Sequence, residues 1–227
     1  MPSMCEFVVC FDLDDTLYKE RSFVLSAYKE VSLFMSQYSN VPSVVIFKSL
    51  VTAFYNGNPA FQVVIKKFNL NISVQTCLDI YRNHKPSLSL SAETESVLEF
   101  LKSQGCVLGL ITDGRTVSQR NKIEALELYR YFQRENILIS EQFGSEKPDV
   151  RNFLYFVNKY PQSRFVYVGD NIGKDFLAPN KLEWNSICLL NNGENIHKQN
   201  FNVKNEYCPK FIINNLLELK NMILLYL

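Results

Sequence analysis

Two aspartates near the N-terminus, Asp12 and Asp14, stand two residues apart directly after the apolar run of residues 7–11. While the chain stays extended, this spacing places both carboxylates on one side, because side chains alternate along a strand. Carboxylates held together repel each other unless a cation lies between them or one keeps a proton. The pair fits a site where one acid is a nucleophile, the other transfers a proton and a divalent metal holds the charge. An acidic surface turn is the alternative for this stretch alone.

Two further polar groups suit a phosphate ligand. Thr112 follows the apolar run of residues 107–111 and precedes Asp113 and Gly114. A hydroxyl at a strand end, beside free backbone N–H groups, can bind a phosphate, although Thr-Asp-Gly is also an ordinary turn. Lys147 precedes Pro148, which disfavours the helical conformation for the preceding residue. This lysine could neutralise a carboxylate and a phosphate, and a solvated loop lysine is the alternative.

A second acidic pair suits a metal ion. Asp170 ends the apolar run of residues 165–168, and Gly169 removes a side chain that would crowd it. Asp175 lies about one helical turn further on. Hard oxygen ligands of this kind suit Mg²⁺, which binds carboxylates and keeps several waters. The sequence therefore predicts a magnesium site near Asp170.

From residue 91 onward, apolar runs alternate with helical patterns. We expect helices at 92–104, 117–128, 149–159, 173–182 and 214–225, between strands at 7–11, 107–111, 137–139, 165–168, 186–190 and 211–213. This alternation is typical of βαβ units and a parallel sheet. The prediction is an α/β fold with a Rossmann-like three-layer α/β/α core. Its sheet would gather the polar clusters at the carboxyl ends of the strands.

Residues 18–88 have a different character, with apolar positions three and four apart and almost no strand signal. The pattern predicts four or five helices, including 44–55, 60–68 and 74–83, with Ser43 and Ser73 as N-caps. We interpret this block as a helical domain inserted between the first and second strands. The core domain would then comprise residues 1–17 and 89–227, and the inserted domain residues 18–88.

Composition excludes several classes of partner. Apolar residues make up 47% of the 227-residue chain, charged residues 21%, and the net charge is +1. There is no basic block that would indicate nucleic acid or an anionic membrane, and no apolar run near the roughly 20 residues of a membrane span. None of the six cysteines forms a C-x-x-C pair, which favours free thiols in a reducing compartment. We expect a cytoplasmic protein without a signal peptide.

In chain order, the four polar clusters resemble the motifs of the haloacid dehalogenase superfamily of aspartate-nucleophile phosphohydrolases. The insertion resembles the type 1 (C1) helical cap of subfamily I, so the resemblance spans essentially the whole chain. The matching segments are Phe11-Asp12-Leu13-Asp14-Asp15-Thr16-Leu17 for motif I, Ile111-Thr112-Asp113-Gly114 for motif II, Lys147-Pro148-Asp149 for motif III, and Gly169-Asp170-Asn171 through Lys174-Asp175 for motif IV.

The resemblance implies a role for each acid. Asp12 would attack phosphorus and form an aspartyl-phosphate. Asp14 would protonate the leaving alcohol and then deprotonate the hydrolytic water. The Asp12 carboxylate, the Asp14 backbone carbonyl and Asp170 would hold Mg²⁺. Asp175 would be a further ligand or a hydrogen-bond acceptor beside the ligands.

The resemblance also implies a phosphate site. Thr112 and the amides around Asp113 and Gly114 would bind phosphoryl oxygens, and Lys147 would stabilise the charge on nucleophile and phosphate. Arg115 could reach an anionic group of the substrate, or it could pair with Asp113 or a neighbouring helix.

These roles predict a Mg²⁺-dependent phosphatase of small phosphate monoesters, such as a sugar phosphate or a nucleoside monophosphate. A phosphomutase of the same superfamily is the alternative, followed by a catalytically idle binding or regulatory module. The 2-haloacid dehalogenases have no acid at the position of Asp14, so its presence favours phosphatase over dehalogenase. The expected partner is a small phosphate ester, and the protein would be a monomer or a homodimer.

Overall fold

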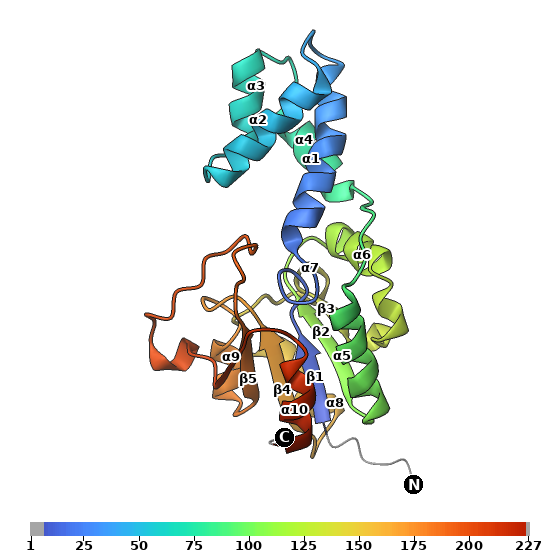
Figure 1. Ribbon diagram of the computed structural model, residues 1–227, viewed down its shortest axis with the longest axis vertical. Helices are drawn as coiled ribbons and strands as arrows, with labels where there is room; N and C mark the ends of the chain where they lie inside the picture. Colours follow the sequence, from blue (N-terminus) through green and yellow to red (C-terminus); the bar gives the residue numbers. More distant parts are fainter. Residues whose placement is uncertain (1–6, 226–227) are drawn as a thin grey trace.

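The computed structural model describes residues 7–225 of the chain, in which six parallel strands form one sheet. The strand order is β3-β2-β1-β4-β5-β6, with β1 in the interior, so the Rossmann-like α/β prediction is confirmed. Figure 1 shows the sheet in the lower part of the molecule. The strands are β1 (Phe7–Phe11), β2 (Val107–Thr112), β3 (Ile137–Ile139), β4 (Arg164–Gly169), β5 (Asn185–Leu189) and β6 (Phe211–Ile213).

Helices cover both faces of the sheet. Side chains of β1 alternate between the two faces, and all five of its residues are buried, so each face needs a covering layer. Phe7, Val9 and Phe11 belong to one buried apolar cluster, and Val8 and Cys10 to a second. The first cluster includes residues of α5 (Ala92–Ser103), α6 (Thr116–Ala125) and α10 (Glu218–Leu225). The second includes residues of α8 (Arg151–Lys159) and α9 (Leu177–Lys181), while the short α7 (Ser140–Phe143) follows β3. Short 3-10 helices complete the core at Leu128–Arg130, Arg134–Asn136 and Asn205–Tyr207.

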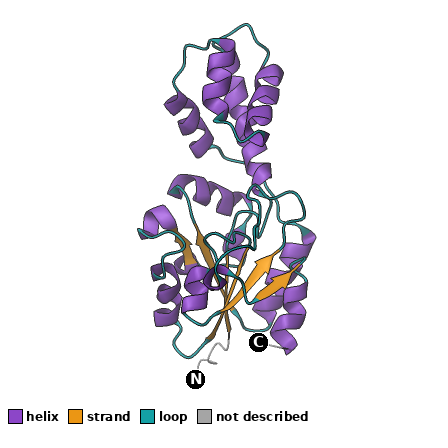
Figure 2. Ribbon diagram, turned by 90° about the vertical axis from the view of Figure 1, so that its left-hand side faces the viewer, coloured by secondary structure: helices purple, strands orange, loops and turns teal. Residues whose placement is uncertain are grey.

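Four helices lie between β1 and α5 and form a separate bundle beyond the carboxyl ends of the strands (Figures 1 and 2). They pack around an apolar cluster of their own, which includes Tyr28, Ile46, Leu50, Phe61 and Val64. We call them the helical insertion. Its members are α1 (Glu20–Ser36), α2 (Ser43–Tyr55), α3 (Ala60–Phe68) and α4 (Val74–Asn83).

Several helix ends differ from the predicted ones. Ser73 caps α4 as expected, with its Oγ accepting a hydrogen bond from the Thr76 amide at 3.0 Å. Ser43, in contrast, is the first residue of α2, and Pro42 occupies the N-cap position. The helix expected at 173–182 begins only at Leu177, because Asp175 ties the preceding turn to two backbone amides.

Two other expectations concern cysteines and membranes. The five cysteines within the described residues are free thiols, and Cys5 lies outside that range. Between residues 7 and 225, no helix combines the length and apolarity needed to cross a bilayer.

Candidate active site

The carboxyl ends of β1, β2 and β4 lie side by side, and each carries one of the predicted polar residues. Asp12 follows β1, Thr112 ends β2, and Asp170 follows β4. Parallel register aligns these ends, since Phe11 pairs with Leu110 on one side and with Val168 on the other. The Asp12 amide continues the ladder by donating to the Val168 carbonyl at 2.9 Å. The sheet therefore brings the motifs together, as the sequence predicts.

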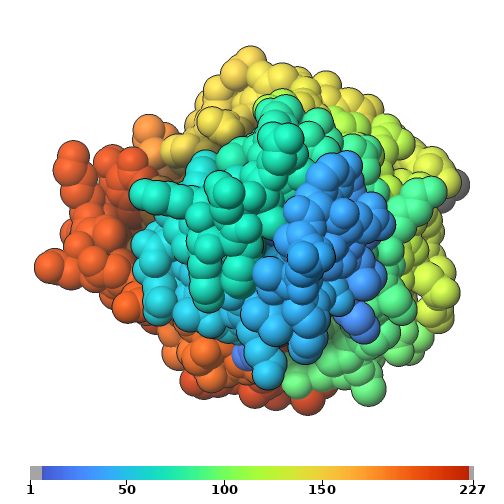
Figure 3. All heavy atoms as spheres, turned by 90° about the horizontal axis from the view of Figure 1, so that it is seen from above, coloured from blue at the N-terminus to red at the C-terminus, as the bar shows by residue number. Residues whose placement is uncertain are grey.

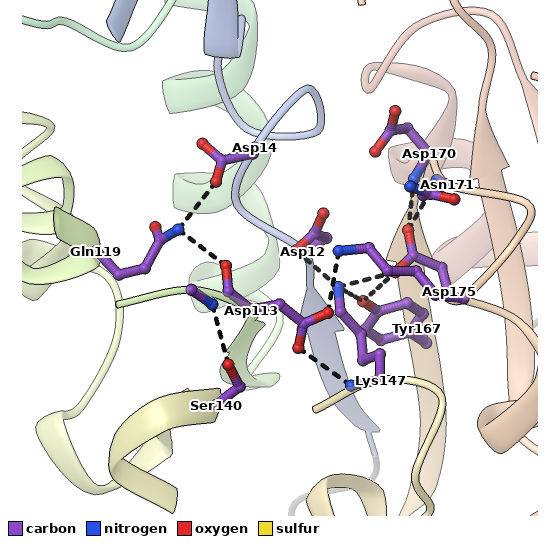
Figure 4. A network of polar contacts seen from close by, with 12 residues as sticks. Asp12, Asp14, Asp113, Gln119, Ser140, Lys147, Tyr167, Asp170, Asn171 and Asp175 are labelled. Atoms are coloured by element: carbon purple, nitrogen blue, oxygen red, sulfur yellow. Dashed lines mark hydrogen bonds and ion pairs between the residues drawn. The ribbon is translucent and has the colours of Figure 1, made fainter. Parts of the chain in front are cut away.

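Lys147 lies at the centre of a buried charge network (Figure 4). Its Nζ atom is 2.7 Å from Oδ1 of Asp12, 2.8 Å from Oδ1 of Asp175, and 2.8 Å from the Tyr167 hydroxyl, to which it donates. An ammonium group has three hydrogen-bond donors, so all three have partners here. Lys147 is only 4% exposed, and such a buried cation requires partners of this kind.

Burial is the largest influence on the pKa values of Asp12, Asp170 and Asp175. It raises the pKa of Asp12 to about 6, although Lys147 acts against the shift. Burial also raises the pKa of Asp170 to about 8, and the charges of Asp175 and Asp12 add to this. Burial opposes ionisation of Asp175 as well, but Lys147, Lys174 and hydrogen bonds lower its pKa overall. Ionisation of both Asp12 and Asp170 would thus place negative charge here that the neighbouring lysines do not fully balance.

This charge fits a divalent cation. Asp12, Asp170 and Asp175 each offer a carboxylate oxygen, and the three atoms lie within 4.8 Å of one another. Three buried carboxylates are a donor set that suits Mg²⁺. The side chain of Asp14 is not part of this group.

Asp175 also shapes the loop that carries Asp170. Its Oδ2 accepts from the amides of Asp170 at 3.1 Å and Asn171 at 2.8 Å. A Cβ atom on Gly169 would come within 2.5 Å of this same oxygen. Gly169 therefore makes room for Asp175, whereas the sequence suggested that it makes room for Asp170.

Asp14 is held by a different set of partners. Its Oδ1 accepts from the Tyr18 hydroxyl at 2.6 Å and from Lys122 Nζ at 2.7 Å, and its Oδ2 accepts from Gln119 Nε2 at 3.1 Å. Figure 4 shows the carboxylate turned towards Gln119 and away from Asp12. Burial would raise the pKa of Asp14, but the contact with Lys122 and these hydrogen bonds lower it overall. Sequence reasoning did not identify Lys122 or Gln119, which lie inside the α6 helix.

The predicted phosphate-binding residues divide into two groups. Thr112 is buried, and its Oγ1 has no hydrogen-bond partner among the described residues. The Gly114 amide already donates to Ser140 Oγ at 2.9 Å, and Arg115 pairs with Glu141 at 2.5 Å. Thr112 thus retains a buried polar atom for a ligand, while Gly114 and Arg115 are engaged with the α7 helix.

Asp113 links two lysines of the site. Its Oδ1 accepts from the Lys147 amide at 3.1 Å, and its Oδ2 accepts from Lys174 Nζ at 3.0 Å. Lys174, which precedes Asp175 in motif IV, is a second cation at this edge. The Asp113 side chain therefore positions both lysines.

The loop of residues 191–208 contributes to the site, which its composition did not predict. Asn195 Nδ2 donates to Asp170 Oδ2 at 2.9 Å, and Asn195 Oδ1 accepts from Lys19 Nζ at 2.7 Å. Asp15 accepts from the Glu20 amide at 3.0 Å and the Ile196 amide at 2.7 Å. The loop thereby joins an acid of the site to the start of the helical insertion.

A pocket of about 410 Å³ opens above these residues. Its walls come from the strand ends, from α1 and α4 of the helical insertion, and from α6; they include Asp12, Asp14, Asp170, Phe23 and Arg82. Seen from above, the helical insertion covers the centre of the molecule (Figure 3). Such a pocket suits a small molecule.

Comparison with known proteins finds relatives that align over most of the chain. The chain is 28% identical over 194 residues to glyceraldehyde 3-phosphate phosphatase of Methanocaldococcus jannaschii, covering 80% of this chain and 84% of that protein. It is 26% identical to the protein of the same name from Methanothermobacter thermautotrophicus, covering 95% and 98%.

Solved structures share the fold at low identity. The putative HAD-hydrolase YfnB of Bacillus subtilis superposes with a TM-score of 0.69 at 20% identity, over 98% of this chain and 100% of that one. A 2-haloacid dehalogenase of Pseudomonas syringae superposes with a TM-score of 0.65 at 20% identity, over 99% and 100%. The haloacid dehalogenase-like hydrolase family matches residues 9–189. That range contains every motif described above, and the chain therefore belongs to the haloacid dehalogenase-like hydrolases.

Proposed function

We propose that this protein is a Mg²⁺-dependent phosphatase of small phosphate monoesters, sugar phosphates foremost, acting through an aspartyl-phosphate. The observation that carries the proposal is the ion pair between buried Asp12 and Lys147, 2.7 Å apart at the end of the central strand. A nucleophile meeting a phosphate dianion needs such a fixed cation. The archaeal relatives named as glyceraldehyde 3-phosphate phosphatases support a sugar phosphate. The presence of an acid at position 14 supports a reaction in which the leaving group receives a proton.

In the first step, an oxygen of Asp12 forms a bond to phosphorus while the bond between phosphorus and the ester oxygen breaks. Asp14, whose pKa is lowered overall, must first take up a proton, which it then gives to the departing alcohol. In the second step, Asp14 takes a proton from water, whose oxygen attacks phosphorus and releases Asp12 and inorganic phosphate. The hydroxyl of Thr112, which has no partner among the described residues, binds a phosphoryl oxygen in both steps, and the charge of Lys147 stabilises the nucleophile and the phosphoryl group.

Asp12, Asp170 and the backbone carbonyl of Asp14 would hold the magnesium ion, with Asp175 beside them. When bound, the ion would neutralise charge on the nucleophile and the phosphoryl group. The raised pKa values of Asp12 and Asp170 support this, because both acids need a nearby cation to ionise fully at neutral pH.

Residues 18–88 would form the cap domain, and residues 1–17 and 89–227 the core domain. The separate apolar cluster of the helical insertion supports this division. Closure of the cap over the pocket would exclude bulk water and select the leaving group.

A screen of phosphorylated metabolites with Mg²⁺ tests the proposal, reading released phosphate for wild type, Asp12→Asn and the control Asp79→Asn. Asp79 is an exposed acid of α4, and within the described residues its carboxylate accepts a hydrogen bond only from Gln75. We expect wild type and the control to hydrolyse a few esters and Asp12→Asn to hydrolyse none. Equal release of phosphate by Asp12→Asn would contradict the assignment of Asp12 as the nucleophile. Isomerised sugar phosphates without released phosphate would identify a phosphomutase instead.

A further inference from the structure

Four lysine and arginine side chains line the pocket, and three of them are already paired. Lys122 pairs with Asp14 at 2.7 Å, Lys174 with Asp113 at 3.0 Å, and Arg115 with Glu141 at 2.5 Å. The fourth is Arg82, at the end of α4. Its guanidinium has no hydrogen bond or ion pair within residues 7–225. A half-buried arginine without a carboxylate leaves its donors free for a ligand.

The backbone at Arg82 is fixed against the core. Ser118 Oγ donates to the Arg82 carbonyl at 2.8 Å. Asn121 Nδ2 donates to the next two carbonyls, of Asn83 at 3.1 Å and His84 at 2.9 Å. These contacts satisfy carbonyls at the end of α4, which have no partner inside the helix. Arg82 is therefore held at the pocket wall by α6.

Arg82 and Asp14 line the same pocket, and neighbouring residues of α6 contact both of them. Ser118, which binds the Arg82 carbonyl, is followed directly by Gln119, which donates to Asp14 Oδ2 at 3.1 Å. Asp14 is the proposed proton donor, so the ester oxygen of the leaving group must approach it. The phosphoryl group would bind beside the proposed nucleophile Asp12 and its partner Lys147.

We propose that Arg82 binds a carboxylate on the leaving group, so that the preferred substrates are phosphate esters of small hydroxycarboxylic acids. This inference rests on the proposed phosphatase function and, within small phosphate monoesters, places the phosphates of hydroxycarboxylic acids ahead of neutral sugar phosphates. A guanidinium binds a carboxylate through two parallel hydrogen bonds. Because the pocket is lined by more acids than lysines and arginines, its one unpaired arginine balances a monoanion better than a second phosphate dianion.

Three esters with the same carbon chain test the proposal: 3-phosphoglycerate, glycerol 3-phosphate and glyceraldehyde 3-phosphate. They differ only at the end far from phosphorus, which is a carboxylate, an alcohol or an aldehyde. The kcat/KM value of each is measured for wild type, Arg82→Gln, Arg82→Lys and the control Arg120→Gln. Arg120 is an exposed arginine of α6 that does not line the pocket and donates to Gln142.

We expect wild type to favour 3-phosphoglycerate over glycerol 3-phosphate by about tenfold or more, the size of a charged hydrogen bond. Arg82→Gln should abolish most of this preference, mainly by raising the KM for 3-phosphoglycerate. Arg82→Lys should restore part of the preference, and the control Arg120→Gln should retain it. The proposal is overturned if wild type has no such preference, or if Arg82→Gln lowers kcat/KM equally for all three esters. A stronger preference for fructose 1,6-bisphosphate would assign Arg82 to a second phosphate and also overturn it.

A binding measurement separates this inference from the phosphatase function. Calorimetry in the Asp12→Asn background compares the dissociation constant of 3-phosphoglycerate with and without Arg82→Gln. Weaker binding with Arg82→Gln supports the carboxylate site even if no ester is hydrolysed. Equal binding overturns it even if hydrolysis is found.

Discussion

Lys122 approaches both carboxylate oxygens of Asp14, at 2.7 Å from Oδ1 and 2.8 Å from Oδ2. The lysine is buried, and its Nζ lies 4.6 Å from the centroid of the Phe23 ring and 3.9 Å from Glu20 Oε1. Phe23 and Glu20 belong to α1, so one ammonium group contacts the core, the loop after β1 and the helical insertion. The position of Asp14 thus depends on a residue outside the four motifs.

Replacing Lys122 with Gln should lower kcat by about 10²-fold, because misplacing a catalytic group by about 1 Å can cost that much. The variant keeps a hydrogen-bond donor but loses the charge that holds Asp14. Steady-state kinetics on any hydrolysed ester provide the measurement, and Lys181→Gln, an exposed position on α9, is the matched control. Unchanged kcat in Lys122→Gln would show that Asp14 needs no such partner.

Without metal, the protein should become less stable as the pH rises from about 5 to about 8, because the folded state binds more protons than the unfolded state in this range. Burial, followed by neighbouring carboxylates such as Asp14, raises the pKa of Glu20 from 4.5 to about 8. The pKa of Asp170 rises from 3.8 to about 8 in the same direction. Each acid stabilises the folded state fully at pH values below its pKa in the unfolded chain. This stabilisation is lost as the pH rises through the higher pKa that the acid has in the folded protein.

Thermal unfolding in EDTA across this pH range measures the effect. Glu20→Gln should reduce the fall in Tm, whereas Glu124→Gln, at an exposed position of α6, should leave it as in wild type. Added Mg²⁺ should raise Tm more at the high end of the range, where protons no longer compete for Asp170. A Tm that stays constant or rises with pH in EDTA would contradict the prediction.

Replacing Asn195 with Ala should weaken magnesium binding. Its side chain donates to Asp170 Oδ2 at 2.9 Å, and losing the partner of a metal-binding carboxylate typically costs about 10–100-fold in affinity. Calorimetric titration with Mg²⁺ gives the dissociation constant directly. Asn200→Ala is the control, because this residue lies in the same loop and its side chain accepts a hydrogen bond from the Asn202 amide and not from a residue of the site. If both variants bind Mg²⁺ equally well, Asn195 does not position Asp170.

The sequence was sufficient for the parts of the site that lie at strand ends. Asp12, Thr112 and Asp170 each follow an apolar run, and a parallel sheet must bring such positions to one edge. Lys122 gave no such signal, because a lysine within a largely polar helix is typical of a solvated face. Its ammonium group contacts Glu20 and Phe23 of α1 only in the folded structure, because these residues lie about a hundred positions earlier in the chain.

The loop of residues 191–208 was unpredictable for a related reason. Its asparagines are typical of any irregular surface segment. Gln199 anchors the loop by donating to the carbonyls of Asp170 and Leu189, both at 2.8 Å, and this brings Asn195 to the site. Neither contact follows a periodic pattern that could be read in advance.

Asp15 has a backbone φ of 56°, an unusual value for a residue other than glycine, and its carboxylate accepts from both Glu20 and Ile196. Ile196 also packs into the apolar cluster of the helical insertion. The insertion is therefore not an independently exchangeable module. A chimaera that receives the insertion of a relative would lose the partner surface for Ile196, so a successful transplant would carry residues 191–199 together with residues 18–88.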